Sequence, residues 1–154
     1  IEENPYRSDF CLQLMLDSLK ELEEEIAERG GKLFYGYGPP QEVVAKAIER
    51  LAIDLVVVNR DYTPYSSSRD QAIEKVCKEK GALFKSLDDL LLQPPETLLK
   101  ANGTPYTIFT PFYKNGMKFQ VDLPKRNDFK NYFNGVVDFA KASSILDEIL
   151  PQKR

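Results

Sequence analysis

The stretch DLVVVNRDYTPYSSSRD, residues 54–70, decides the fold of this chain. It opens on an uninterrupted apolar run, Leu55–Val58, which is typical of a parallel strand covered by helices on both faces. It continues through a turn rich in Pro, Ser and Asp into a helix predicted from about Ser67 to Lys80. A buried strand that leads directly into a helix indicates an α/β protein.

The segments on either side continue this alternation of helices and strands. Apolar residues at helical spacing predict helices over 8–29 and 41–51. Short apolar runs predict two further strands, over 32–37 and 82–86. Such alternation is typical of a parallel sheet with right-handed crossovers, so we expect an α/β fold with helices flanking the sheet.

Capping residues support several of these boundaries. Ser8 is expected to accept a hydrogen bond from a free backbone N–H at the start of the first helix. Gly30-Gly31 and Gly81 are expected to end helices, because glycine tolerates the left-handed conformation found there. Farther along, Thr110-Pro111 has the pattern of an N-cap followed by proline at the first helical position.

The last third of the chain gives weaker patterns. A short helix is predicted around 95–100, and a polar connector over 117–127. Apolar residues at helical spacing then predict one helix or two over 128–150. This helical pattern is weakened at Gly135, since glycine disfavours a helix interior.

The composition is that of one globular domain, with 154 residues, 42% of them hydrophobic and 29% charged. With 21 basic against 24 acidic residues, the chain lacks the basic excess of a surface that binds duplex DNA by itself. The longest apolar run, Leu55–Val58, is far too short to cross a membrane, and the N-terminal Ile-Glu-Glu-Asn does not open a signal segment. We therefore expect a cytoplasmic protein with no membrane partner.

Histidine is absent from the sequence, which excludes Ser-His-Asp and Cys-His catalysis. The two cysteines, Cys11 and Cys77, lie among apolar residues of predicted helices and are expected to be buried free thiols. There is no CxxC pattern, whereas a structural zinc site takes about four ligands. The sequence therefore predicts neither a metal site nor a catalytic residue.

Polar residues follow the Leu55–Val58 run, at the edge where parallel α/β sheets bind ligands. Asn59 and Asp61 can hydrogen-bond a ligand there, or they can simply shape the turn. In the next helix, Asp70 complements the helix dipole, whereas Arg69 opposes it. We expect Arg69 to have a carboxylate partner elsewhere, for example across a domain boundary.

A cluster of aromatic residues lies in PYTIFTPFYKNG, residues 105–116, at Tyr106, Phe109, Phe112 and Tyr113. Beside Lys114, these rings can stack on nucleic-acid bases. Clusters of this kind more often pack in a core or between domains, and this is the interpretation that we favour.

Three segments, in this order, resemble the amino-terminal α/β domain of the DNA photolyase and cryptochrome family: YRSDFCLQLMLDSLKELEEEIAERGGKLF (6–34), NRDYTPYSSSRDQAIEKV (59–76) and LLLQPPETLLKANGTPYTIFTPFYKN (90–115). The resemblance implies a Rossmann-like parallel sheet with flanking helices over residues 1–118. This sheet would be incomplete, because the family's first two strands would precede Ile1. Residues 119–154 would be a linker and helix toward an absent FAD-binding helical domain.

Photolyases use a flavin and light to split pyrimidine dimers in DNA. The resemblance therefore implies a fragment of a deoxyribodipyrimidine photolyase, an enzyme whose FAD and damaged DNA bind the absent domain. This chain would supply the antenna-side domain, hold no cofactor and be inactive alone. Its exposed strand edges favour self-association. The alternatives are a cryptochrome-type photoreceptor domain and a non-catalytic nucleotide-binding or interaction module.

The resemblance also assigns individual residues. Arg7 and Asp61 match the antenna-contact positions of deazaflavin-type members. Tyr65 and Ser66 replace the Asn-Glu pair of folate-type members, so the full-length protein is expected to carry a deazaflavin- or flavin-type antenna, or none. The motif residues with structural or interdomain roles are Asn59, Tyr65, Arg69, Asp70, Phe109, Thr110, Pro111 and Phe112.

Overall fold

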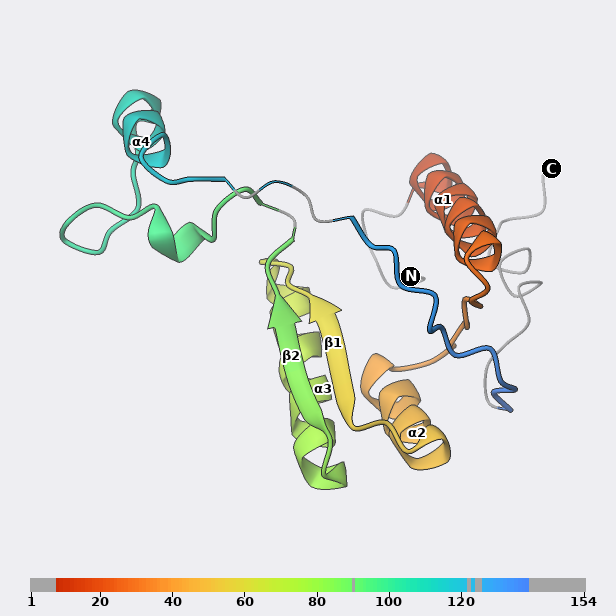
Figure 1. Cartoon of the computed structure of the whole chain (residues 1–154). Helices are drawn as coiled ribbons and strands as arrows, with labels where there is room; N and C mark the ends of the chain where they lie inside the picture. Colours follow the sequence, from red (N-terminus) through yellow and green to blue (C-terminus); the bar gives the residue numbers. More distant parts are fainter. Residues whose placement is uncertain (1–7, 90, 122, 124–125, 139–154) are drawn as a thin grey trace. The chain divides into compact units, whose positions relative to one another are not determined.

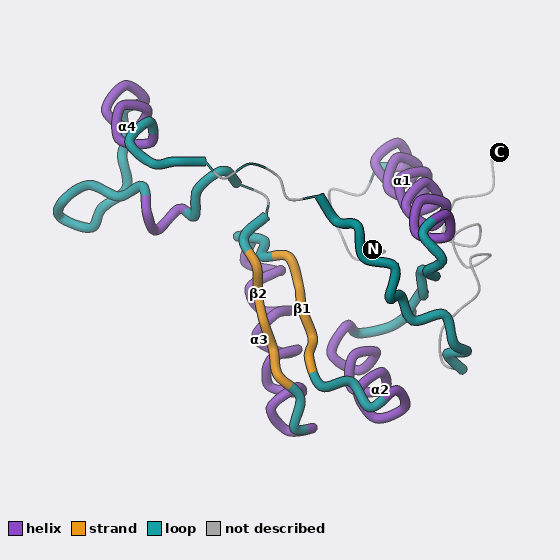
Figure 2. The backbone as a smooth tube through the Cα atoms, in the orientation of Figure 1, coloured by secondary structure: helices purple, strands orange, loops and turns teal. Residues whose placement is uncertain are grey.

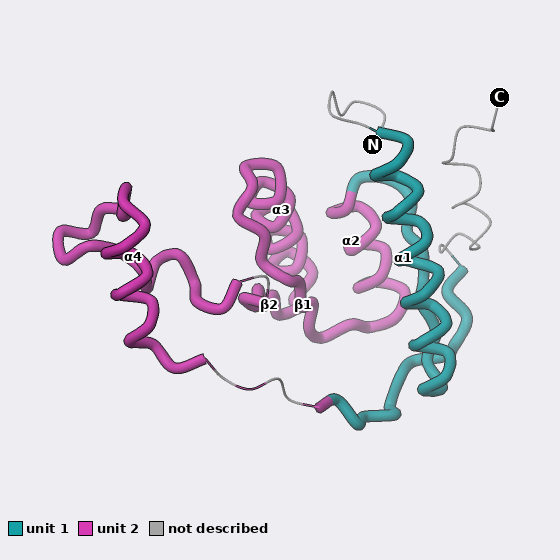
Figure 3. The backbone as a smooth tube through the Cα atoms, turned by 90° about the horizontal axis from the view of Figure 1, so that it is seen from above, with its two compact units in different colours: residues 1–39, 127–154 teal, residues 40–126 magenta. Residues whose placement is uncertain are grey.

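The computed structural model describes residues 8–89, 91–121, 123 and 126–138 (Figure 1). Its elements are, in chain order, α1 (Asp9–Glu28), α2 (Pro40–Leu51), β1 (Leu55–Asn59), α3 (Pro64–Lys80), β2 (Leu83–Leu87), the 3-10 helix η1 (Pro95–Thr97) and α4 (Phe109–Gly116). Contacts divide the chain into two compact units, residues 1–39 with 127–154 and residues 40–126 (Figure 3).

The sheet of the second unit is a parallel pair, with β1 beside β2 (Figure 2). The register pairs Leu55 with Leu83 and continues to Asn59 opposite Leu87. Helix α3 makes the crossover between the two strands, as the alternating sequence pattern predicts. The predicted α/β class, the parallel pairing and the strands near 54–58 and 82–86 are therefore confirmed.

One face of this sheet carries the hydrophobic core. Ile48 of α2 packs with Ile73 and Cys77 of α3 and with Ala82 at the start of β2. On the strands, the side chains of the paired residues Val56 and Phe84 contact this cluster. Helices α2 and α3 thus cover the same face of the sheet, and the predicted burial of Cys77 as a free thiol is confirmed.

The opposite face of the sheet is exposed. Its apolar residues are Leu55, Val57, Leu83 and Leu87, of which Leu83 is 70% exposed and Val57 47%. Within the second unit, the Leu55–Val58 run is therefore covered on one face only, and the predicted cover on both faces is not formed there. Alternate residues of a strand point to opposite faces, and α2 and α3 contact only the face that carries Val56.

Helix α1 confirms the first predicted helix, but with a different buried face from the one the cysteine suggested. Leu12 and Leu16, one turn apart, are buried and pack with Leu19 and Tyr35. Cys11 is exposed, so its predicted burial is wrong: it lies a quarter-turn away from the leucine pair.

The ends of α1 follow the prediction in part. Ser8 occupies the N-cap position, but its side chain makes no capping hydrogen bond. At the other end, Gly30 takes a positive φ of 81°, and its N–H donates to the carbonyl oxygen of Ala27. The glycine signal for the end of the helix is therefore confirmed, whereas the serine cap is not formed.

The strand predicted over 32–37 is not formed. This segment is loop, with a single bridge residue at Tyr35. A strand needs a neighbour along its whole length, and in the described residues the only ladder joins β1 to β2. Tyr35 is instead held by its side chain, because its hydroxyl donates to Glu23 Oε2 at 3.1 Å. Burial, together with Glu23, raises the pKa of Tyr35 to about 12.

Residues 128–138 are not helical, so the helix predicted from Asp128 is wrong over this range, and residues 139–150 lie outside the described part. Asn127 explains the difference locally, since its side-chain oxygen accepts from the N–H of Phe129 at 3.1 Å and favours a turn. The segment packs within its own unit, where the rings of Phe133 and Phe34 lie 5.9 Å apart.

Candidate functional site

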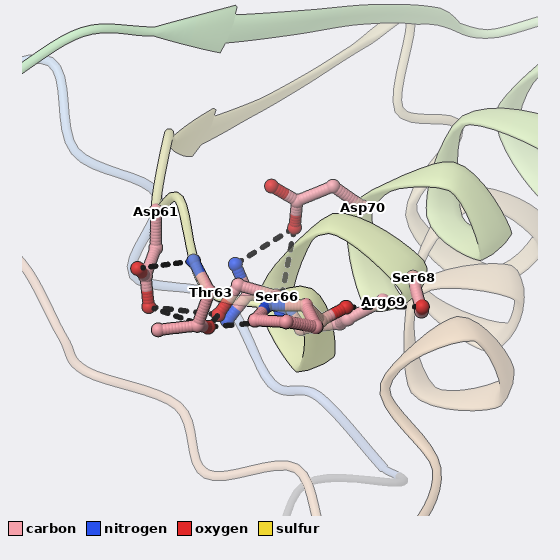
Figure 4. Close-up of polar contacts among 7 residues, drawn as sticks. Asp61, Thr63, Ser66, Ser68, Arg69 and Asp70 are labelled. Carbon is pink, nitrogen blue, oxygen red and sulfur yellow. Dashed lines mark hydrogen bonds and ion pairs between the residues drawn. The ribbon is translucent and has the colours of Figure 1, made fainter. Parts of the chain in front are cut away.

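The chain leaves β1 through a turn organised by Asp61 (Figure 4). Asp61 Oδ1 accepts from the backbone N–H of Thr63 at 3.1 Å, and Oδ2 accepts from the hydroxyl of Ser66 at 2.8 Å. The hydroxyl of Thr63 also approaches Oδ2, at 3.4 Å. Hydrogen bonds to the carboxylate, first from Ser66 and then from Thr63, lower the pKa of Asp61 below its ordinary value.

The same turn starts helix α3. Thr63 is the N-cap, because its hydroxyl oxygen accepts from the backbone N–H of Ser66 at 3.2 Å. Pro64 follows at the first helical position, where a missing N–H costs nothing. The helix therefore begins before the predicted Ser67, and Ser66, which is 3% exposed, lies within its first turn.

Arg69 and Asp70 form an ion pair with each other. Arg69 Nε donates to Asp70 Oδ1 at 2.8 Å, and Arg69 Nη2 lies 2.7 Å from the same oxygen. The carboxylate partner expected elsewhere is therefore the next residue. Since α3 begins at Pro64, both residues lie beyond its first turn, whereas Tyr65 lies in it and is exposed.

A second polar network, the Arg60 cluster, joins the carboxyl ends of both strands to η1. It consists of Arg60, Tyr62, Asp88 and Glu96. Arg60 Nη1 donates to Asp88 Oδ1 at 3.2 Å and to Glu96 Oε2 at 3.3 Å, and Nη2 contacts Glu96 Oε1. The guanidinium lies 4.7 Å from the Tyr62 ring centre, and the Tyr62 hydroxyl donates to Asp88 at 2.7 Å.

The residues of this cluster shift one another's pKa values. The bond from Arg60 lowers the pKa of Glu96, and the bond to Asp88 raises the pKa of Tyr62. Beside the cluster, Asn59 Nδ2 donates to Asp89 Oδ2 at 3.4 Å. Asn59 was expected at this edge of the sheet, whereas Tyr62, Asp88 and Glu96 were not. The sequence did offer a signal for part of this cluster. Arg60 and Asp88 carry opposite charges and directly follow two strands, and the carboxyl ends of neighbouring parallel strands lie at the same edge of a sheet.

The predicted aromatic cluster is confirmed as a set of neighbouring rings, and it lies at the surface. Phe109 stacks with Tyr113 at a centroid distance of 5.8 Å, and Phe112 lies 6.5 Å from Phe109. Tyr106 lies 6.3 Å from Phe112. Phe109 is 73% exposed, so the rings do not belong to a core.

The start of α4 differs from the prediction. Ile108 is the N-cap, and Phe109 is the first helical residue. Thr110 and Pro111 therefore lie inside the first turn, where Thr110 cannot act as the cap. Proline is tolerated there because the first N–H groups of a helix have no intrahelical partner.

The described ranges also bear on metal sites and membrane spans. No three Asp, Glu, Cys or His side chains gather there in an arrangement that could hold a metal ion. None of the helices in those ranges has the length and apolar character that a membrane span needs. The predicted antenna contact Arg7 lies outside the described residues.

Comparison with known proteins identifies the family. A sequence model described as DNA photolyase matches residues 3–127, and the chain belongs to this family. It is similar to the deoxyribodipyrimidine photo-lyase of a Synechococcus strain, with 32% identity over 97 residues, which is 63% of this chain and 20% of that protein.

Solved structures show the same relationship. A photolyase from Sulfolobus tokodaii, solved with two FAD molecules and described as implying a novel light-harvesting cofactor, has a TM-score of 0.82 and 34% identity over 98% of this chain and 33% of its own. A class III photolyase from Agrobacterium tumefaciens has a TM-score of 0.69 and 25% identity over 86% of this chain and 27% of its own. The chain thus spans a fifth to a third of the length of these relatives.

Proposed function

We propose that this chain is the antenna-side α/β part of a deoxyribodipyrimidine photolyase, which repairs pyrimidine dimers in DNA with light. The observation that carries the proposal is the family match over residues 3–127. The named relatives and the solved neighbours reported above support photolyase over a cryptochrome-type photoreceptor. We infer that the flavin chemistry and the contact with damaged DNA belong to a part of the photolyase that this chain does not span.

The chain's own contribution is docking. The exposed rings of Phe109, Phe112 and Tyr113 form an apolar surface on α4, and exposed aromatic patches commonly mark an interface. Their proposed partner is the flavin domain of the same protein. Thr110 and Pro111 lie in the first turn of the helix that presents these rings.

Arg7 and Asp61 remain the proposed antenna contacts of the full-length protein. The FAD-containing Sulfolobus tokodaii structure favours a flavin-type antenna over a deazaflavin. Asp61 contributes mainly by fixing its turn, because its carboxylate already accepts from Thr63 and Ser66. We expect the isolated chain to bind no flavin.

The sheet suggests a further contact. In the described residues β1 pairs with β2 only, so its second edge has unpaired backbone groups. We propose that this edge receives the family's first two strands in the full-length protein. In the isolated chain it favours self-association, which light scattering detects as a mass that rises with protein concentration.

Absorption spectra and a repair assay test the proposed function. The full-length gene product is expected to show flavin bands and to repair a dimer-containing oligonucleotide under blue light, whereas the 154-residue chain shows neither activity nor flavin. A full-length protein that holds flavin but repairs no dimer supports the cryptochrome alternative. A colourless full-length protein contradicts both and supports the non-catalytic module.

A further inference from the structure

The Arg60 cluster connects parts of the chain that are far apart in sequence. The backbone N–H of Arg60 donates to the carbonyl of Leu87 at 2.8 Å, so the sheet ladder fixes where the side chain starts. From there the guanidinium reaches Asp88 and Glu96, which are 28 and 36 positions away. It therefore ties the carboxyl end of β1 to the end of β2 and to η1.

From η1, a continuous set of contacts leads to α4. The side chain of Leu98 lies beside Gly116, the last residue of α4, where an added Cβ would be 3.9 Å from Leu98 Cδ2. Leu99 and Pro105 form an antiparallel bridge. Gln93 Nε2 donates to the carbonyl of Gln120 at 3.0 Å, which joins the two ends of the segment. Residues 91–121 thus form one internally bonded arm that carries the exposed rings.

An isolated surface ion pair holds a protein segment only weakly, but Arg60 is not in an isolated pair. It bonds the carboxylates of Asp88 and Glu96, both Nη1 and Nη2 contact Glu96, and its guanidinium carbon lies 4.7 Å from the Tyr62 ring centre. Tyr62 also donates to Asp88, so two residues, Arg60 and Tyr62, hold the Asp88 carboxylate. A lysine could not reproduce this arrangement, since it lacks the planar fork.

We propose that Arg60 is a positioning residue that holds the 91–121 arm, and with it the aromatic surface of α4, in the orientation used for docking. The docking role rests on the proposed function, but the positioning role does not. Arg60 fixes Glu96 against the end of the sheet, and the bonded arm transmits that position to Phe109 and Phe112.

Hydrogen exchange measured by mass spectrometry on the 154-residue chain tests the positioning. In Arg60→Met, amide exchange in residues 95–116 is expected to rise by about fivefold or more, because surface ionic networks hold segments of low local stability. Exchange within α3 is expected to stay unchanged. Arg60→Lys should restore part of the protection, and Glu96→Gln should add nothing to Arg60→Met.

A matched control is the ion pair between Lys80 and Glu49, which joins α3 to α2 in the same unit and is similarly exposed. Lys80→Met removes an equivalent charge, and it is expected to leave the arm unaffected. The inference is overturned if Arg60→Met leaves exchange in residues 95–116 unchanged, or if Lys80→Met raises it equally. Raised salt should loosen the arm of the wild-type chain but not that of Arg60→Met.

The same measurement on the full-length protein separates the two claims. If α4 docks on the flavin domain, residues 109–116 exchange more slowly in the full-length protein than in this chain. Equal exchange there contradicts the docking role, whatever Arg60 does. If residues 109–116 stay equally protected when Arg60→Met is introduced into the full-length protein, docking is supported and the positioning role is overturned.

Discussion

The ring of Tyr132 lies against Gly31, so closely that a Cβ added to this glycine would come within 2.7 Å of Tyr132 Cγ. The same Cβ would also lie 2.7 Å from Ile26 Cγ2, on the last turns of α1. A second contact joins these segments, since Arg29 Nη1 approaches the carbonyl of Asn127 at 3.4 Å. The 127–138 segment is therefore part of the first unit and packs where α1 ends.

Gly31→Ala is expected to displace the 127–138 segment from the end of α1. Neither contact is with the far end of a flexible side chain, so overpacking should lower the free energy of unfolding by about 1–3 kcal/mol. Chemical denaturation of the two proteins measures the difference. Gly116→Ala is the matched control, because its Cβ would meet only an ordinary contact at 3.9 Å. Equal stability of Gly31→Ala and the wild-type chain would contradict the close packing.

Thr63→Ala is expected to weaken the start of α3. The threonine hydroxyl satisfies the backbone N–H of Ser66, and loss of an N-cap of this kind costs about 1 kcal/mol. Ser68→Ala is the control: its hydroxyl donates to the carbonyl of Pro64 at 3.0 Å on the exposed side of the same helix and caps no free N–H. The cap interpretation fails if both variants lose the same unfolding free energy.

The sequence predicted elements well where local signals agree. The apolar run at Leu55–Val58 lies in β1, and the left-handed Gly81 ends α3, both as expected. The predicted first residue of a helix was wrong where a neighbouring residue could cap the helix equally well. Helix α3 begins at Thr63-Pro64 and not at the predicted Ser67. Helix α4 has Ile108, not Thr110, at its N-cap position. Single-residue caps shift a boundary without changing the pattern around it.

Contacts between distant segments were beyond the sequence for another reason. Arg60 meets Glu96 only after two strands have paired and the next loop has turned back over their ends. The local sequence pattern around either residue does not indicate that Arg60 and Glu96 come into contact. The turn at Asp61 could be anticipated as one of two roles, because its partners Thr63 and Ser66 lie within five positions.

Asp61 is expected to make stability depend on pH in the acid range. Its folded pKa is lowered, so its contribution is present above the unfolded pKa of about 4 and is lost as the pH falls through the lower folded value. The unfolding free energies of the wild-type chain and Asp61→Asn should therefore differ at pH 7 and converge at about pH 2. Urea denaturation at several pH values measures both curves.

Ser66→Ala provides the second variant for this test. It removes the hydroxyl that contributes most to the lowered pKa of Asp61 but keeps the carboxylate. Its acid slope should lie between those of the wild-type chain and Asp61→Asn. Parallel curves for the wild-type chain and Asp61→Asn at every pH would show that the carboxylate does not stabilise the turn.

The two thiols are expected to react at very different rates. Cys11 is exposed on α1, whereas Cys77 is fully buried in the core between α3 and β2. Burial also raises the pKa of the Cys77 thiol, which depletes the reactive thiolate. A chromogenic disulfide reagent should therefore modify the native chain in one fast step and reach the second thiol only in denaturant. Cys11→Ser should abolish the fast step, and Cys77→Ala should preserve it. Fast reaction in native Cys11→Ser would mean that Cys77 is accessible and that the core formed by Ile48, Ile73 and Ala82 opens during labelling. That result would contradict the close packing of this core.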